Sequence, residues 1–307
     1  MNKLEKLIVK GLEALESRDY PVAARAGREL IELRHSYGFE ILARCHSDQG
    51  QTDEALRVLD EGLLRVPGHW RLLELKATAL SDGERWEEAL PFYRAALEAD
   101  NARPESVRYN LGLTLQRMGR AEEAIEQFRQ AEEVSEACSD LWVLIRTRQI
   151  EAVAPAEALA LAERTVAEME SSGMLEGLGR VKRSLGGALV SMGQREKALE
   201  LAHKMLNLWD EDAFWILREA EDRRSDKTSS YRALFEGVFY DGRPFYRTYK
   251  LVAESPDDLL EVARSVENHE LRDSLRLVEI LEATETATGP GLPLGVYWRS
   301  PYFTSSA

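Results

Sequence analysis

The stretch YNLGLTLQRMGRAEEAIEQFRQAEEV, residues 109–134, decides the fold of most of this chain. Its apolar residues recur every three or four positions on both sides of Gly119, a spacing that predicts two helices joined by a short turn. Glycine suits the left-handed backbone that ends many helices. Gly112 and Ala124 are small enough to let the two helices approach closely, while Phe128 fills the space beside them.

The same unit returns along the chain. It is clear in ILARCHSDQGQTDEALRVLDEGLLRVPGHW, residues 41–70, and in SLGGALVSMGQREKALELAHKML, residues 184–206. In all three copies a glycine stands five residues before an alanine of the second helix. Weaker copies fill the gaps, and one of them has an extra residue between Gly83 and Ala89. The second-helix alanine occurs at positions 23, 55, 89, 124, 158 and 198, so the spacings are 32, 34, 35, 34 and 40 residues.

This pattern resembles the tetratricopeptide-repeat family, whose repeat is 34 residues long with Leu-Gly in the first helix and Ala-x-x-x-Phe in the second. The resemblance covers residues 4–224. It implies a mainly α fold, a right-handed solenoid of about six helical hairpins plus a capping helix, or about thirteen helices. The cap is expected in DAFWILREAEDRR, residues 212–224, with Phe214, Trp215 and Leu217 facing inward.

The pattern changes after Arg224. Residues 225–230, SDKTSS, are a polar stretch that predicts a linker between a repeat domain, 1–224, and a second domain, 231–307. The segments YRALFEGVFY and FYRTYKLVA alternate like strands around Asp241-Gly242-Arg243-Pro244, which predicts a hairpin. A helix is expected from Ser255, and SLRLVEILEA and GVYWRSPYF are expected as strands, with Pro301 at an edge or an end. The second domain is therefore predicted to be a small α+β domain of order ββαββ.

Composition narrows the functional classes. The chain has 307 residues and a formal net charge of −14, which disfavours nucleic acid because phosphate binding needs a basic surface. It has no apolar run of the roughly 18 residues needed to span a bilayer. Its two cysteines, Cys45 and Cys138, fall in separate repeats, so we expect no disulfide framework and a cytoplasmic protein.

Groups that carry chemistry are few and scattered, so we expect no enzyme, no cofactor and no metal site. Cys45 beside His46 is compatible with a reactive thiol or half a metal site, but a packed residue in a repeat helix is the favoured reading. The acidic cluster near the start of the last helix is read as its solvated first turn rather than as a metal or acid–base site; it consists of Asp257, Asp258 and Glu261. The aromatic residues of the last domain are read mainly as core, with ligand stacking as the alternative; they include Tyr231, Phe235, Phe239, Phe245, Tyr249, Tyr297 and Trp298.

In the tetratricopeptide-repeat family, the first helices of successive hairpins line a groove that accepts a peptide or a partner's helix. The resemblance places the groove positions of this chain on Tyr37, Glu40, Arg44 and Asp48, on Tyr109, Leu113, Gln116 and Arg117, on Val143 and Thr147, and on Arg180 and Arg183. Some family members clamp a terminal carboxylate with Lys and Asn residues. Asn110 matches one of these positions, whereas the lysines are absent. The arginines either pair with acidic groups of a partner or only solvate the helices.

The resemblance favours a non-catalytic scaffold or adaptor that binds a partner protein or peptide in the groove. Two other readings stay open. One is a bacterial immunity-type inhibitor that binds and neutralises a toxin, and the other is an enzyme or ligand site in the C-terminal domain. The sequence identifies neither the partner nor the oligomeric state.

Overall fold

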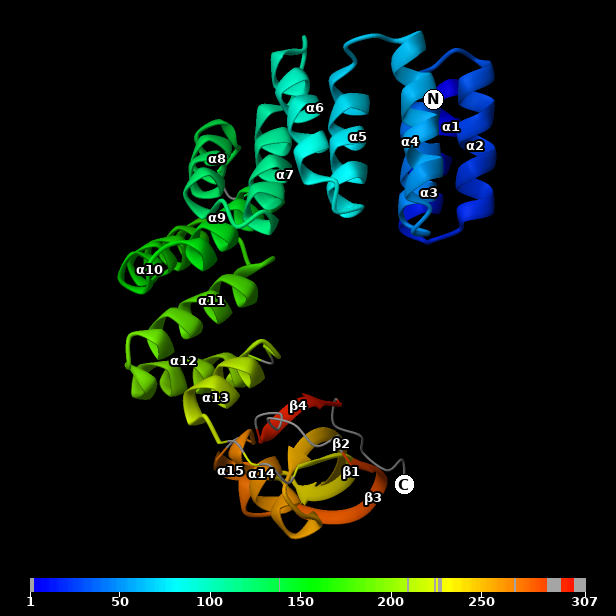
Figure 1. The fold of residues 1–307 in the computed structure, drawn as a ribbon. Helices are drawn as coiled ribbons and strands as arrows, with labels where there is room; N and C mark the ends of the chain where they lie inside the picture. The colour runs from blue at the N-terminus through cyan, green and yellow to red at the C-terminus, as the bar shows by residue number, and fades with distance from the viewer. Residues whose placement is uncertain are drawn as a thin grey trace. The chain divides into compact units, whose positions relative to one another are not determined.

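The computed structural model describes residues 3–137, 139–208, 210–223, 225, 228–267, 269–285 and 294–300. The chain forms two compact units, residues 1–145 and residues 146–307. The first unit is helical, whereas the second contains helices and a sheet (Figure 1). The packing of each unit follows separately.

Thirteen helices precede residue 222 in the described chain, the number that the repeat spacing predicts. They are α1 (Lys3–Glu16), α2 (Tyr20–Glu32), α3 (Tyr37–Ser47), α4 (Thr52–Arg65), α5 (Trp70–Asp82), α6 (Trp86–Glu98), α7 (Pro104–Arg117), α8 (Ala121–Val134), α9 (Asp140–Ala152), α10 (Pro155–Ser172), α11 (Leu178–Ser191), α12 (Arg195–Asn207) and α13 (Ala213–Glu221). In the first unit the pairs α1–α2, α3–α4, α5–α6 and α7–α8 pack against each other as hairpins, and α11–α12 do so in the second.

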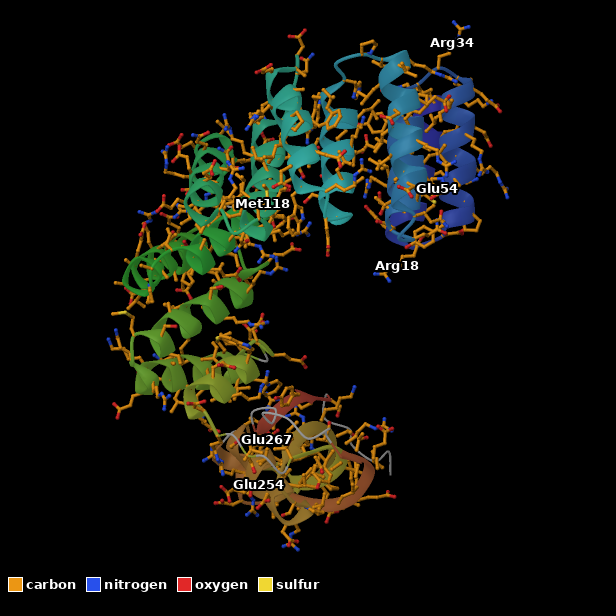
Figure 2. The ribbon with its side chains drawn as sticks, viewed as in Figure 1. Arg18, Arg34, Glu54, Met118, Glu254 and Glu267 are labelled. Carbon is orange, nitrogen blue, oxygen red and sulfur yellow. The ribbon has the colours of Figure 1, made fainter. Side chains whose placement is uncertain are left out.

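The turn inside most hairpins has a left-handed residue five positions before the second-helix alanine. Gly50, Gly119 and Gly193 occupy this position with φ of 72°, 75° and 71°, which confirms their predicted role. Glu84 occupies it before Ala89 with φ of 58°, whereas Gly83 has φ of −83°. The apparent extra residue is therefore no insertion, because a glutamate takes the backbone conformation that glycine takes elsewhere. Arg18 does the same in the first hairpin, and Figure 2 shows Arg18 and Arg34 at opposite ends of the first helices.

Small residues permit the close helix contacts. A Cβ atom on Gly112 would lie 2.5 Å from Cε1 of Phe128, and Phe128, Ala124 and Ala131 are fully buried. Between α2 and α3 the backbones themselves touch, since a Cβ atom on Gly38 would lie 2.6 Å from the carbonyl oxygen of Gly27. These contacts leave no room for larger side chains, so the repeat glycines and alanines are set by packing.

The sheet of the second unit has the predicted ββαββ order. Its strands are β1 (Ser229–Val238), β2 (Pro244–Ala253), β3 (Arg276–Glu285) and β4 (Gly295–Arg299), with η1 (Pro256–Asp258), α14 (Leu259–Ser265) and α15 (His269–Arg272) between β2 and β3. All pairs are antiparallel in the order β3-β1-β2-β4. The predicted hairpin turn is present, with Gly242 at φ of 83°. Pro301 lies outside the described residues.

One face of this sheet forms the core under α14. Tyr231, Phe235, Phe245 and Tyr249 are buried there, as the core reading of these aromatics predicts, and Phe235 meets Tyr249 edge to face at 5.1 Å. Ser255 caps the helical segment as predicted, because its backbone and hydroxyl both donate to the carboxylate of Asp258. The side chain of Trp298 lies outside the described ones.

A buried cluster of charged residues, the arginine cluster, joins the sheet to the last repeat helices within the second unit. Glu267, labelled in Figure 2, accepts hydrogen bonds from Arg247 (2.6 Å), Arg299 (3.2 Å) and the hydroxyl of Tyr249. Arg299 also donates to the carbonyl oxygen of Leu206 in α12 (3.4 Å). Burial, reinforced by Glu267, raises the pKa of Tyr249. The sheet is thus fastened to α12, while β4 packs against α13.

Candidate partner-binding surfaces

The predicted groove positions on α3 are only partly accessible. Tyr37 is exposed, with its ring centre 5.5 Å from that of His35, and Asp48 is exposed at the end of the helix. Arg44 is half-buried. Glu40 is buried and forms an ion pair with Arg71 of α5 at 3.2 Å.

The predicted positions on α7 also divide between surface and core. Tyr109 and Leu113 are half-buried and pack against the hydrophobic core of the first unit. Gln116 is exposed. Arg117 is exposed as well, but it forms an ion pair with Asp82 of the preceding repeat at 2.8 Å.

The first helices of this unit are linked by a chain of polar contacts, the bridging network. Glu74 of α5 is fully buried and accepts hydrogen bonds from Arg71, from Ser106 (2.6 Å) and from Asn110 (3.0 Å). Burial alone would lower the pKa of Arg71, but the carboxylates of Glu74 and Glu40 outweigh it and raise that pKa. The network connects α3, α5 and α7. Asn110, which matches a carboxylate-clamp position of the family, therefore binds a carboxylate of the chain itself.

The two predicted positions on α9 do not lie on the surface. Val143 is 3% exposed and Thr147 is 4% exposed, so neither side chain is open to a partner in this structure. The family register places them in a groove, whereas local packing turns them inward. The neighbouring Arg146 is buried too and pairs with Glu168 of α10 at 3.4 Å.

The second unit contains an open cavity of about 630 Å³, the α11 groove. It is bounded by the end of α9, the start of α10, one face of α11 and α13. Along α11 the lining residues Arg180, Arg183, Ser184, Gly187 and Ser191 recur at three- and four-residue steps, as one face of a helix requires. The predicted residues Arg180 and Arg183 therefore share one groove.

Trp215 forms the opposite side of the α11 groove. It is half-buried, and its ring lies 3.3 Å from the position a Cβ atom would take on Gly187. The guanidinium of Arg183 stacks on this ring at 4.8 Å from its centre and lies 3.6 Å from the carboxylate of Asp212. Arg180 is exposed and forms no ion pair within the part of the chain that the structure describes.

The expected inward orientation of Trp215 was wrong. The buried face of α13 is made of Ala213, Ile216, Leu217 and Ala220, with Phe214 beside them. These residues follow the spacing i, i+3, i+4, i+7, whereas Trp215 and Glu219 fall four apart on another face and line the groove. The helical periodicity of residues 213–220 was the signal that places Trp215 outside the buried face of α13.

A second cavity of about 330 Å³ shares Arg183 and Trp215 with the α11 groove. It is also lined by Asp210, Arg218 and Tyr297 of β4. Burial lowers the pKa of Arg218, which donates to the carbonyl oxygen of Val296 (2.6 Å) and stacks on Tyr297 at 3.9 Å. Burial raises the pKa of the Asp210 carboxyl. The end of the sheet therefore supplies one side of this cavity.

The other candidate chemistry has structural partners. Cys45 is buried, donates to the carbonyl oxygen of Tyr20 at 3.6 Å, and has a pKa raised mainly by burial. Asp258 accepts hydrogen bonds from the capping residue Ser255, and Glu261 pairs with Arg223 at 3.3 Å. Within the described ranges, no three His, Cys, Asp or Glu side chains are arranged to hold a metal ion. The described helices include none that is both long and apolar enough to cross a bilayer.

Comparison with known proteins agrees with this architecture. Residues 71–137 match the family model of the tetratricopeptide repeat. No curated protein matches the chain.

Several solved structures share the fold. PilW, a type IV pilus biogenesis factor, is 13% identical with a TM-score of 0.54, over 67% of this chain and 93% of PilW. The pilF product of Pseudomonas aeruginosa is 17% identical with a TM-score of 0.53, over 67% and 91% of the two chains. A tetratricopeptide repeat protein from Parabacteroides merdae is 17% identical with a TM-score of 0.51, over 71% and 85%. Identities this low show a shared fold alone. The chain therefore contains tetratricopeptide repeats over residues 71–137, within a series of similar helix pairs that is followed by a small antiparallel sheet.

Proposed function

We propose that the chain is a non-catalytic scaffold or adaptor that binds a partner protein or peptide on the first helices of its repeats. The observation that carries this proposal is the α11 groove, a cavity of about 630 Å³ beside a half-buried tryptophan. Its volume falls within the roughly 300–1,000 Å³ of ligand-binding clefts. Tryptophan and arginine are the residues that most often dominate binding free energy at interfaces, and here Trp215, Arg180 and Arg183 line one groove.

The chemistry of the groove favours binding. Its guanidinium groups, its indole ring and its apolar side chains hold a ligand through charge, stacking and burial. Ile150 of α9, Val153 just after that helix and Ala188 of α11 give the groove an apolar lining. Such a surface supplies affinity and selectivity without a chemical step.

The first unit has a smaller role in this proposal. Tyr37, Asp48 and Gln116 are exposed, and we propose them as additional contacts. Arg117 contributes only if the partner replaces Asp82 as its ion-pair partner. The bridging network already engages Glu40 and Asn110 of these helices.

The proposed partner is a protein or peptide in the cytoplasm. The net charge of −14 opposes binding to nucleic acid, whose affinity depends on neutralising phosphates. Cys45 is a free, buried cysteine, as is usual in proteins of reducing compartments.

The proposal is tested with a photocrosslinking residue, benzoylphenylalanine, placed at Ser191 in the groove and, as a control, at the exposed Leu175 outside it. We expect a partner from native lysate to crosslink to position 191 and not to position 175. The captured partner is then purified and titrated against Ser184→Trp, which fills the groove, and Ser171→Trp, which lies on the exposed surface of α10. Equal affinity of these two variants would contradict the proposal.

A further inference from the structure

One face of α11 separates charge from small side chains. Arg180 and Arg183 lie in the first turns, and Ser184, Gly187 and Ser191 follow along the same face. A ligand lying along the groove therefore meets two cations first and then a low surface bounded by Trp215.

We propose that the α11 groove recognises an internal segment of a partner in which a side-chain carboxylate stands next to a large apolar side chain. This inference rests on the proposed function, because it names the class of partner for the same groove.

The balance of charge selects an anionic group. Glu151 is exposed but already paired with Arg148 at 2.8 Å. Arg183 has a carboxylate of Asp212 at 3.6 Å, and Arg180 has no ion pair among the residues that the structure describes. Arginine binds carboxylates through two parallel hydrogen bonds, so Arg180 and Arg183 offer more donor capacity than the chain itself uses. Glu219 of α13 also lines the groove, and its carboxylate interacts with the neighbouring Arg218. Arg180 is therefore the groove cation that no carboxylate of the described residues pairs with.

The lining beyond the arginines selects an apolar side chain. Ile150, Val153 and Ala188 provide apolar surface, and the half-buried indole of Trp215, whose edge lies against Gly187, adds to it. An apolar side chain placed here removes both its own surface and that of the groove from water, which is favourable.

A carboxylate inside the segment suits the geometry better than one at its end. The two arginines lie one turn apart on an exposed face of α11, and small residues continue from them toward Ser191. The partner's backbone therefore has room to continue past the cations. Asn110, the match to a terminal-carboxylate clamp, is occupied by Glu74 in the first unit.

The test uses the full chain and amidated, fluorescein-labelled decapeptides. Each peptide carries a central Leu or Phe with Glu, Gln or Lys at the preceding position, and binding is measured by fluorescence anisotropy. We expect Glu peptides to bind at least about tenfold more tightly than Lys peptides, since hydrogen bonds to charged groups contribute roughly 1.5–3 kcal/mol. The variant Arg180→Glu is expected to reverse this order. Arg195→Glu, at another exposed arginine at the start of α12 that pairs with Asp222, is the control and is expected to leave the order unchanged.

The other outcomes separate this inference from the proposed function. Binding that Ser184→Trp abolishes, but that shows no preference for Glu, overturns the inference and leaves the groove as the binding site. Binding that Ser184→Trp does not alter overturns the groove itself. A further set of Gln peptides ends directly after the apolar residue with a free carboxylate. If these peptides bind as tightly as the amidated Glu peptides, the groove recognises a terminal carboxylate and the inference is overturned. Absence of binding by every peptide up to its solubility limit overturns it too.

Discussion

The first helices of the two units use similar residue types in different ways. In the first unit, polar side chains on α3, α5 and α7 bind one another through the bridging network, with Glu74 fully buried at its centre. In the second unit, Arg180 on α11 has no ion pair among the described residues and faces an open cavity with Trp215. A charged residue at a first-helix position is therefore not by itself a sign of partner binding. Its neighbours decide whether it holds repeats together or remains available.

The largest expected effect is on the free energy of unfolding, which tests whether the bridging network holds the repeats together. We predict that Glu74→Ala destabilises the protein by about 3 kcal/mol, because it leaves the half-buried Arg71 without its nearest counter-charge. Chemical denaturation followed by circular dichroism measures the change. Glu54→Ala, which breaks an exposed pair with Arg57, is the control and should cost less than about 0.5 kcal/mol. Equal effects of the two variants would show that the network is not a structural device.

The second-largest expected effect is on partner binding, which distinguishes the α11 groove from the first unit. We predict that Trp215→Ala and Arg180→Ala each weaken partner binding by about 2 kcal/mol, or roughly 30-fold, if both act as interface hot spots. The double variant Tyr109→Ala with Arg117→Ala tests the first unit in the same calorimetric titration. Because Tyr109 packs on the core and Arg117 is paired, we expect a smaller loss from this pair. A larger loss from the double variant than from Trp215→Ala would move the main interface to the first unit.

Glycines provide a sharper comparison of packed and open helix faces. We predict that Gly112→Ala destabilises by about 1–2 kcal/mol, because its Cβ atom would lie 2.5 Å from Phe128 and force the core to shift. Gly187→Ala should be nearly neutral. Its Cβ atom would meet only the edge of the half-buried Trp215 at 3.3 Å, and alanine favours helix by about 1 kcal/mol. Thermal melts of both variants check the difference, and a destabilised Gly187→Ala protein would mean that Trp215 is held rigidly.

The smallest expected effect concerns pH in the second cavity. Burial raises the folded-state pKa of Asp210 above 3.8, so the folded protein holds this proton more tightly than the unfolded chain. The resulting stabilisation is present below pH 3.8 and is lost as pH rises through the folded-state pKa. We therefore predict that Asp210→Asn is more stable than the parent at neutral pH, by up to about 1 kcal/mol, and equally stable below pH 3.8. Denaturation at both pH values measures this, and an unchanged difference across the range would contradict it.

Periodicity made the repeat fold predictable, and its limits appear at particular residues. Glycine spacing located the turns at Gly50, Gly119 and Gly193, but Glu84 adopts the same backbone with a side chain that gives no such signal. The family register predicted that Val143 and Thr147 line the groove, whereas both are buried in the structure. A register transferred from a family cannot account for how one divergent helix rotates against its neighbours.

The candidate site was predictable in part. Arg180 and Arg183 were identified from the family register, and the structure places both in one groove. Trp215 was expected to face inward with Phe214 and Leu217, although the spacing of the buried residues around it places it on another face. Arg218 was missed and Tyr297 was read mainly as core, because their contact joins α13 to β4 across a long stretch of sequence.

The sequence by itself determined the helix pairs, their number, the turns and the ββαββ order, because these depend on local periodicity and on residues close together in the chain. Only the tertiary structure decided which polar groups are already satisfied and which stay open. The bridging network, the arginine cluster and the α11 groove all join residues from different elements. Their pairing depends on distances between side chains, and a linear pattern of residue types does not contain those distances.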